Sequence, residues 1–119
     1  MTQEEKDLLL RDLSSRLPYE VKVQFSYIIT SPAILKGINK DLIECDIAVC
    51  ELEDVKPYLL PLSSMTPKQK AELSMLVIGV EDIFKSFLIE VEFYHKHHID
   101  YRGLIPMGLA NNATNLNIY

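Results

Sequence analysis

The spacing of apolar residues changes twice along this chain, and the changes limit the folds that it can adopt. Near the start, Leu9, Leu13 and Leu17 recur every three or four residues, as on one face of a helix. From Val21 to Val49 apolar and polar residues mostly alternate, which is typical of half-buried strands. Helical spacing returns between Leu73 and Tyr94. A helix, a group of strands and a second helical region predict an α+β domain.

Two threonines mark where helices should begin. Thr2 is followed by Glu5, a capping box in which the hydroxyl and the carboxylate each accept a bond from a free backbone N–H. Thr66 should cap a second helix, with Pro67 at the first helical position and Gln69 at the third. The first helix is therefore predicted to start at the beginning of the sequence, and the second to start after Thr66.

The region 66–97 fits either one long helix or two helices broken near Gly79. We favour two, because residues 76–80 form a short apolar run that leads into a new cap. Three apolar residues, Ile78, Ile89 and Phe93, fall off the main stripe of this region. If they are exposed, they form a second apolar face, and we interpret them as a candidate self-association surface.

The middle of the chain predicts a small antiparallel sheet. Val21–Tyr27 alternates, Ser31 and Pro32 should break the strand, and Ile34–Ile38 and Ile43–Val49 supply two more strands joined by a short turn. Residues 57–62 add a fourth extended piece. Three or four strands barely bury enough surface alone, so we expect the C-terminal helical region to pack on one face of a meander, either open or curled toward a small barrel.

One domain is expected over residues 1–110, because a chain of 119 residues can bury a real core by itself. The polar residues 111–119 are predicted to be a flexible tail. The pattern places nine apolar residues in the core: Leu13, Val23, Phe25, Ile47, Leu73, Val80, Phe84, Leu88 and Val91.

The charge balance narrows the class of partner. A net charge of −5 argues against a general nucleic-acid binder, which needs lysines and arginines to displace counterions, and against docking on anionic lipid. The longest apolar run is far short of the roughly 20 residues of a membrane span. The acidic, amphipathic start does not resemble a signal peptide, so we expect a cytoplasmic protein with no membrane partner.

The two cysteines, Cys45 and Cys50, are five residues apart in a stretch that we interpret as one strand. An odd spacing on a strand places two side chains on opposite faces, where they cannot form a disulfide with each other. Buried or half-buried free thiols in a reducing compartment are the expected state.

All three histidines lie within four residues of the segment HKHHIDYRGLIPMGLA. If the helix extends to His98, then His95 and His98 share a face, and Asp100 could supply a third metal ligand. A second spaced pair, or a glutamate placed as in H-E-x-x-H, is missing. Histidines in a last helical turn are also favoured by the helix dipole, so we expect no metal and no other cofactor.

Asp100, Tyr101 and Arg102 allow two interpretations. An aspartate beside a histidine can orient it for acid–base work, and an arginine can hold a carboxylate or phosphate. Alternatively, Asp100 and Arg102 fasten the loop to the helix end while Tyr101 packs against the core. The chain has no G-x-S-x-G and no glycine-rich phosphate loop, so no catalytic residue is assigned. Together with His95 and His98, these three stay binding candidates.

Three segments resemble a known family: EEKDLLLRDLSSRLPYEVKV at residues 4–23, KPYLLPLSSMT at 56–66 and HHIDYRGLIPMGLA at 97–110. They look like small uncharacterised proteins of gut Bacteroidales, often encoded on prophages or other mobile elements. The resemblance implies a bacterial or phage cytoplasmic protein and the order helix, strands, proline-rich connection, helices. It transfers no catalytic or binding residue. The end NATNLNIY departs from the family, whose members tend to end near GMY.

Three classes of function follow from the sequence. The favoured one is a non-enzymatic accessory protein that binds another protein or itself. The second is an enzyme, or a protein that binds a metal or small molecule, using the segment from His95 to Arg102. The third is a single-stranded nucleic-acid binder, which would need Phe25 and Tyr27 exposed beside Lys22.

Overall fold

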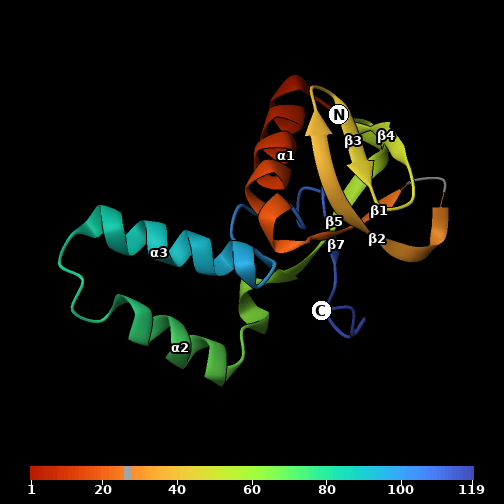
Figure 1. The fold of residues 1–119 in the computed structure, drawn as a ribbon. Helices are drawn as coiled ribbons and strands as arrows, with labels where there is room; N and C mark the ends of the chain where they lie inside the picture. Colours follow the sequence, from red (N-terminus) through yellow and green to blue (C-terminus); the bar gives the residue numbers. More distant parts are fainter. Residues whose placement is uncertain (26–27) are drawn as a thin grey trace.

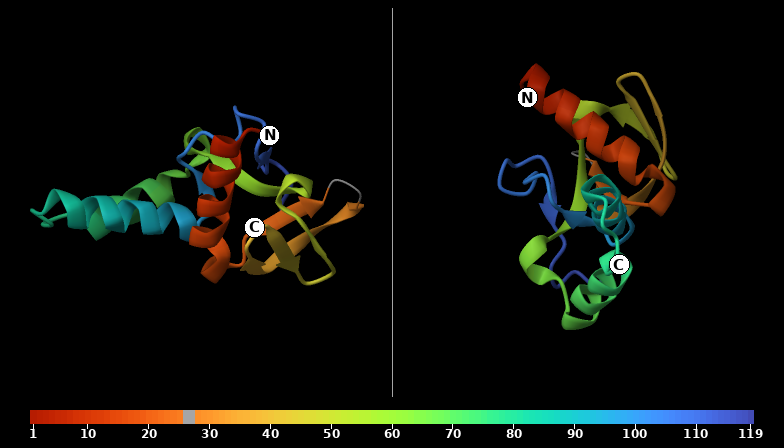
Figure 2. Two further views of the ribbon diagram at one scale, coloured as in Figure 1. Left: turned by 90° about the horizontal axis from the view of Figure 1, so that it is seen from above. Right: turned by 90° about the vertical axis from the view of Figure 1, so that its left-hand side faces the viewer.

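The computed structural model describes residues 1–25 and 28–119 and divides into a body and a projection (Figure 1). The body contains a mixed sheet with one helix against it, and the projection is a pair of helices that extends to one side in Figure 1 and in the left view of Figure 2, and points toward the viewer in its right view. The helices and strands are α1 (Gln3–Arg16), β1 (Lys22–Phe25), β2 (Ile28–Asn39), β3 (Leu42–Cys45), β4 (Val49–Glu51), β5 (Val55–Pro61), α2 (Pro67–Val77), α3 (Ile83–Lys96), β6 (Ile99–Asp100) and β7 (Asn111–Asn112). Short 3₁₀ turns lie at η1 (Leu17–Tyr19), η2 (Leu52–Asp54) and η3 (Leu62–Ser64).

The sheet has the strand order β4-β3-β2-β1-β5-β6, and β7 also pairs with β5. The strands β1 to β4 form an antiparallel meander, and β5 pairs antiparallel with β1. The two short strands β6 and β7 pair parallel with consecutive parts of β5, β7 at Tyr58 and Leu59 and β6 at Leu60 and Pro61. The α+β class predicted from the sequence is confirmed, with an N-terminal helix, mostly antiparallel strands and C-terminal helices.

Strand β2 passes through Ser31 and Pro32, so the predicted break there is wrong. The register between β1 and β2 shifts between Val23 and Phe25, and the described pairing with β3 starts only at Leu35. Pro32 therefore lies at an irregularity of the ladder, one of the places where a strand tolerates a residue without an N–H. The predicted end of the first strand at Tyr27 lies outside the described residues.

The segment predicted as one strand from Ile43 to Val49 is two strands, β3 and β4, joined at a bend. The backbone of Cys45 bonds to the carbonyl of Ala48, and the Asp46 carboxylate accepts the Ile34 N–H at 3.0 Å. Ile47 lies in this bend and is exposed, so its predicted place in the core is wrong. Alternation alone does not distinguish one long strand from two shorter strands that are joined by a bend.

The two cysteines lie on neighbouring strands and both point into the core, so their predicted placement on opposite faces is wrong. Both are free thiols. Burial raises the pKa of Cys50 to about 12, which keeps this thiol protonated and unreactive at neutral pH.

The core lies between α1 and the sheet. Leu13, Val23 and Phe25 are buried there, as predicted. Further buried apolar side chains of this core come from α1, the residue before β1, the strands and the segment after β6, among them Leu9, Val21, Ala33, Leu35, Ile43, Val55, Leu59 and Leu104. Phe25 belongs to this core, so it is not the exposed stacking platform that a nucleic-acid binder would need.

The region 66–97 forms two helices, which confirms that interpretation of the sequence. The predicted capping box at Thr2 and the predicted N-cap at Thr66 are both present, and Thr66 also forms a capping box with Gln69. Helix α2 ends before Gly79, whose φ of +79° is a left-handed conformation that favours glycine, and the Asp82 carboxylate caps α3. We call residues 67–96 the hairpin. Phe84 and Leu88 are exposed on it, so their predicted place in the core is wrong.

Residues 111–119, predicted as a flexible tail, lie beside β5 and β1. Asn111 and Asn112 form β7, and Asn111 donates a hydrogen bond to Gln24. The Tyr119 hydroxyl donates to the carbonyl of Tyr58 at 2.7 Å and accepts the N–H of Lys22 at 2.9 Å. These contacts place the segment against the same domain as residues 1–110.

Candidate functional site

Two charged residues are completely buried where α1 meets the end of α3. The relative exposure of both Asp12 and Arg16 is 0%. The Arg16 Nε atom lies 2.8 Å from the Asp12 Oδ2 atom, and its Nη2 donates to the carbonyl of Ile99 at 2.7 Å. A longer bond of 3.4 Å joins Nη1 to the carbonyl of Tyr94. Arg16 therefore ties the first helix to the end of α3 and to β6.

Arg102 approaches the same carboxylate from the opposite end of the chain. Its Nε atom lies 3.1 Å from the Asp12 Oδ1 atom, so one buried carboxylate holds two guanidinium groups. The ring of Tyr101 lies beside both cations, with the guanidinium carbons of Arg16 and Arg102 at 5.8 Å and 5.0 Å from its centre. A tyrosine ring at this distance attracts a cation and shields the pair from water.

His95 completes this cluster. Its Nε2 atom lies 2.7 Å from the hydroxyl of Tyr101; His95 is buried and Tyr101 is half-buried. Burial lowers the pKa of His95, and the charge of Arg16 lowers it further. Burial also raises the pKa of Tyr101. Both shifts favour a neutral histidine bonded to a neutral phenol at neutral pH.

Asp100 bonds to the backbone of the turn that follows it. Its two oxygens accept the backbone N–H groups of Leu104 at 3.0 Å and Ile105 at 2.9 Å. The carboxylate is buried, so the two bonds hold the turn after β6 without competition from water. Both oxygens are engaged by the backbone and neither is directed at a neighbouring histidine.

The helix α3 ends at Lys96, before the last two histidines. His98 has a φ of +60° and stacks on Tyr119, with the ring centres 3.8 Å apart. Burial, followed by the charge of Arg16, lowers the pKa of His98 to about 4. His95 and His98 therefore do not share a helix face, because the helix extension on which that expectation depended is missing.

The five candidates from the sequence do not form one open site. His95, Tyr101 and Arg102 meet around Asp12, Asp100 bonds to the following turn, and His98 faces Tyr119. A shallow surface pocket touches only Asp100 and Tyr101 among them. Among the described residues, no group of three or more His, Cys, Asp or Glu side chains is placed to hold a metal ion.

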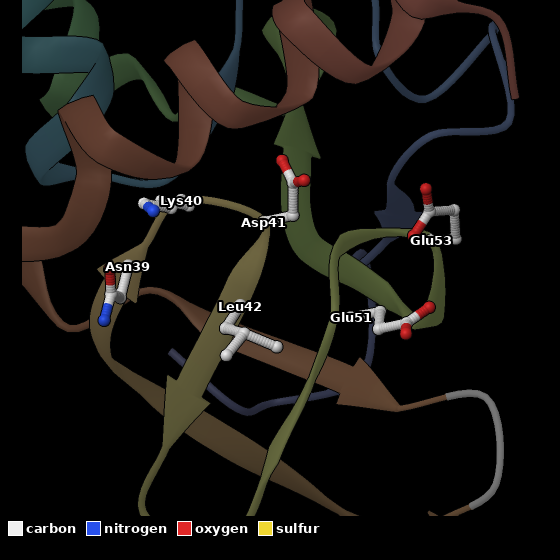
Figure 3. A pocket seen from close by; sticks show the side chains of 6 residues that line it. All are labelled: Asn39, Lys40, Asp41, Leu42, Glu51 and Glu53. Carbon is white, nitrogen blue, oxygen red and sulfur yellow. The ribbon is translucent and has the colours of Figure 1, made fainter.

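Another pocket lies near α1, between the β2–β3 turn and the end of β4 (Figure 3). Its lining residues are Asn39, Lys40, Asp41, Leu42, Glu51 and Glu53. The Glu53 carboxylate forms an ion pair with Lys6 of α1 at 2.5 Å, and Lys6 lowers the pKa of Glu53 by bonding to it. This pocket is an open acidic surface without a histidine or a buried polar group.

The hairpin carries the most apolar surface that is exposed in the described part of the chain. Four large side chains of α3 form one stripe along it, and their exposed fractions lie between 58% and 82%: Ile83, Phe84, Phe87 and Leu88. Ile78 at the tip is also exposed. An apolar stripe this contiguous is unusual on a protein without a partner. None of the helices in the described residues combines the length and apolar character needed to cross a membrane.

The self-association candidates from the sequence have three different environments. Ile78 is exposed, Ile89 is half-buried and Phe93 is only 4% exposed. Ile89 and Phe93 line the groove between α2 and α3, so they hold the hairpin together. On α3, the predicted core residues Phe84 and Leu88 are therefore exposed, whereas two residues predicted for the surface are half-buried (Ile89) and buried (Phe93).

Sequence reasoning missed Asp12 and Arg16 as the centre of the cluster. A signal for them exists, because Leu9, Asp12, Leu13 and Arg16 follow the i, i+3, i+4, i+7 spacing of one helix face. Two charges of opposite sign, four residues apart on an otherwise apolar face, indicate a buried pair. No local sequence pattern predicts that Arg102 is the second cation bound to the Asp12 carboxylate.

The comparison with models of protein families found no match, and the searches of curated proteins and of solved structures found none either.

The shifted histidine predicts a pH effect. His98 in the unfolded chain takes up a proton near pH 6.5, whereas the folded side chain does so only near pH 4. Below about pH 6.5 the unfolded state binds more protons, so the free energy of unfolding falls as pH decreases through this window and the loss is complete near pH 4. After allowance for the partly exposed ring, we expect this loss to be about 2 kcal/mol.

Urea unfolding of the wild type and of His98→Asn, at several pH values across that window, measures the effect. Asparagine tolerates the left-handed backbone at this position, so the variant should fold. Carboxylates titrate equally in both proteins, and the difference between the two pH profiles isolates His98. Parallel profiles would show that the ring does not resist protonation in the folded state.

Proposed function

We propose that this protein is a non-enzymatic interaction protein and that its projecting hairpin is the element that binds a protein. The observation that carries the proposal is the stripe of Ile83, Phe84, Phe87 and Leu88, which the body leaves uncovered. Burying such side chains against a partner gains about 25 cal/mol for each Å² removed from water.

The direction of the stripe strengthens the proposal. Ile89 and Phe93 face α2, and residues at the spacing of Phe84, Phe87 and Leu88 lie on the opposite side of the same helix. The stripe therefore makes no contribution to the hairpin itself. Side chains with no internal role that are large and apolar favour a binding function.

The contacts of the polar cluster around Asp12 favour a structural role for the cluster over a catalytic one. Its buried charges are paired with one another and with backbone groups, and both oxygens of Asp100 accept backbone bonds. A catalytic centre needs a group free to reach a substrate. The cluster instead fixes the base of the hairpin, where α3 meets α1, and so presents the stripe at a constant angle.

The cellular setting that we propose for this protein comes from its sequence resemblance. The resemblance of the segments 4–23, 56–66 and 97–110 to mobile-element proteins favours an accessory factor that acts in the cytoplasm of a bacterium or during growth of its prophage. Binding of a protein through an apolar helix face suits such a factor, because it needs neither a cofactor nor a positively charged surface.

The test compares three immobilised proteins in a bacterial extract: the wild type, Phe84→Ser/Leu88→Ser, and Ile47→Ser/Val49→Ser. The last is a matched control, because Ile47 and Val49 are exposed apolar side chains on the body. Both variants should keep the wild-type melting curve, since exposed substitutions usually change stability by no more than about 0.5 kcal/mol.

We expect the wild type and the Ile47→Ser/Val49→Ser control to retain the same proteins, measured by quantitative mass spectrometry, and the hairpin variant to lose them. Retention of one identical set by all three proteins would contradict the proposal, because the stripe would then have no part in binding.

A further inference from the structure

The segment after β7 is attached to the body at its far end. We call residues 114–119 the latch. The hydrogen bonds described for residues 114–117 join near neighbours in the sequence. The hydroxyl of Tyr119, in contrast, accepts the N–H of Lys22 at 2.9 Å and donates to the carbonyl of Tyr58 at 2.7 Å. Lys22 and Tyr58 stand next to the last described pair of the β1–β5 ladder, so this one hydroxyl takes the place of the next rung.

The ring of Tyr119 lies against an imidazole and an ammonium group. The His98 ring stacks on it, with the ring centres 3.8 Å apart and the ring planes 14° apart. The Lys22 ammonium lies 5.7 Å from the ring centre and also bonds to the carbonyl of Ile118. Burial raises the pKa of Tyr119, so the phenol keeps its proton and can donate it in a hydrogen bond. The end of the latch, rather than its length, therefore holds it to the body.

The imidazole of His98 is poorly placed to accept a proton. Its Nδ1 atom is buried and has no hydrogen-bond partner. In the described part of the chain, the charged groups that act on this ring are Arg16 from α1, Lys22 at the start of β1 and the adjacent His97, and all three are bases. The face of Tyr119 attracts cations, but Lys22 already lies near the same ring. Protonation would therefore create a partly buried charge among other cations, with no acceptor at Nδ1.

The backbone of His98 is fixed on both sides. Its N–H donates to the carbonyl of His95 at 3.2 Å, and its carbonyl accepts the N–H of Leu60 at 2.8 Å. These bonds tie the residue to the end of α3 and to β5, and its φ of +60° leaves it in a small allowed region. Within the described residues, the latch has no backbone–backbone bond to the sheet. When the stack of the two rings breaks, the latch is therefore the part that moves.

We propose that the latch is released by acid: a proton on His98 breaks its stack with Tyr119, and residues 114–119 leave the body while β7 stays paired with β5. The release returns the N–H of Lys22 and the carbonyl of Tyr58 to water and uncovers the His98 ring. The end of the β1–β5 ladder is then open to another hydrogen-bonding group. This device does not involve the hairpin and stands apart from the proposed function.

The equilibrium between the closed and the open latch sets the expected size of the effect. A free imidazole takes up a proton near pH 6.5, whereas His98 under the latch does so near pH 4. Below pH 6.5 the open state binds more protons, so the opening constant rises as the pH falls, and the rise is complete near pH 4. Because α1 and β5 also shield the ring, we expect a rise of at least about tenfold rather than the full difference.

NMR titration of the full chain, from neutral pH down to the region of pH 4, tests the latch. The carbon-bound ring protons of the histidines report their pKa values. Tyr119→Ala removes the ring that covers His98, so the pKa of His98 should rise toward 6.5, with at least an about tenfold gain in proton affinity. Tyr119→Phe keeps the stack and loses the two hydroxyl bonds, and its value should lie between those of the wild type and Tyr119→Ala.

The ring signals of Tyr119 follow the latch itself. In the wild type they should move to the positions of an exposed tyrosine over the same pH range in which His98 takes up its proton. In His98→Asn they should stay constant over that range, whereas His97→Asn, the matched control, should keep the wild-type response. An unchanged pKa of His98 in Tyr119→Ala would overturn the proposal. So would Tyr119 signals that move only when the whole chain unfolds, or a pH response that disappears in His97→Asn.

Discussion

Replacing Asp12 with Ala should lower the free energy of unfolding by about 3–5 kcal/mol, because it leaves Arg16 buried without a counter-charge. Arg16 is fully buried, and its remaining partners would be two backbone carbonyls. Urea unfolding at neutral pH, followed by circular dichroism, measures the change. A loss of this size is a large part of the stability of a small domain, so we expect a partly unfolded population at 37 °C.

Two further variants test the cause of that loss. Arg102→Ala removes the partner that is still partly exposed and leaves the pair of Asp12 and Arg16 intact, so the melting temperature should fall by only several degrees. The double variant Asp12→Leu/Arg16→Met replaces both buried charges by apolar groups and should recover most of the stability that Asp12→Ala loses. If the double variant is less stable than Asp12→Ala, the loss does not come from an unpaired cation.

Asp100→Ala is expected to produce the second large effect, a loss of about 2–4 kcal/mol, because two backbone N–H groups lose their acceptor. The groups belong to Leu104 and Ile105, and Leu104 is completely buried. The turn should therefore loosen before the rest of the body unfolds. Hydrogen exchange of these two amides, measured by NMR, reports the loosening directly.

Asp100→Asn provides the matched comparison for this prediction. The amide keeps one oxygen that can accept a backbone bond, so its effect should lie between those of the wild type and of Asp100→Ala. Unchanged exchange at Leu104 and Ile105 in the alanine variant would mean that packing, rather than the carboxylate, holds the turn.

Local signals account for the parts of the fold that could be predicted from the sequence. The capping boxes at Thr2 and Thr66 depend on residues three positions apart, and both are present. The break at Gly79 is also local, because its left-handed backbone is a property of one residue. The alternation that predicted β1 needs only neighbouring residues, and the buried positions Val23 and Phe25 follow it.

The errors arose where position in the tertiary structure outweighs periodicity. The stripe of α3 has the spacing of a buried face, but this face passes the edge of the body and leaves Phe84 80% exposed. Periodicity identifies the apolar side of a helix and does not identify what lies beside it. Of the candidate site, the segment from His95 to Arg102 was found, whereas its partner Asp12 lies 90 residues from Arg102.

That separation determines the order in which the chain can become stable during synthesis. Helix α1 leaves the ribosome before the strands and the hairpin and carries Asp12 and Arg16, whose native partners at Ile99 and Arg102 follow 83 and 90 residues later. At about 5–20 residues per second, this interval is on the order of ten seconds. Until then the helix cannot bury its charged face at low cost. The contacts that hold α1 against the end of α3 and β6 therefore form late in synthesis. Ribosome-bound chains without residue 102 should remain sensitive to proteases.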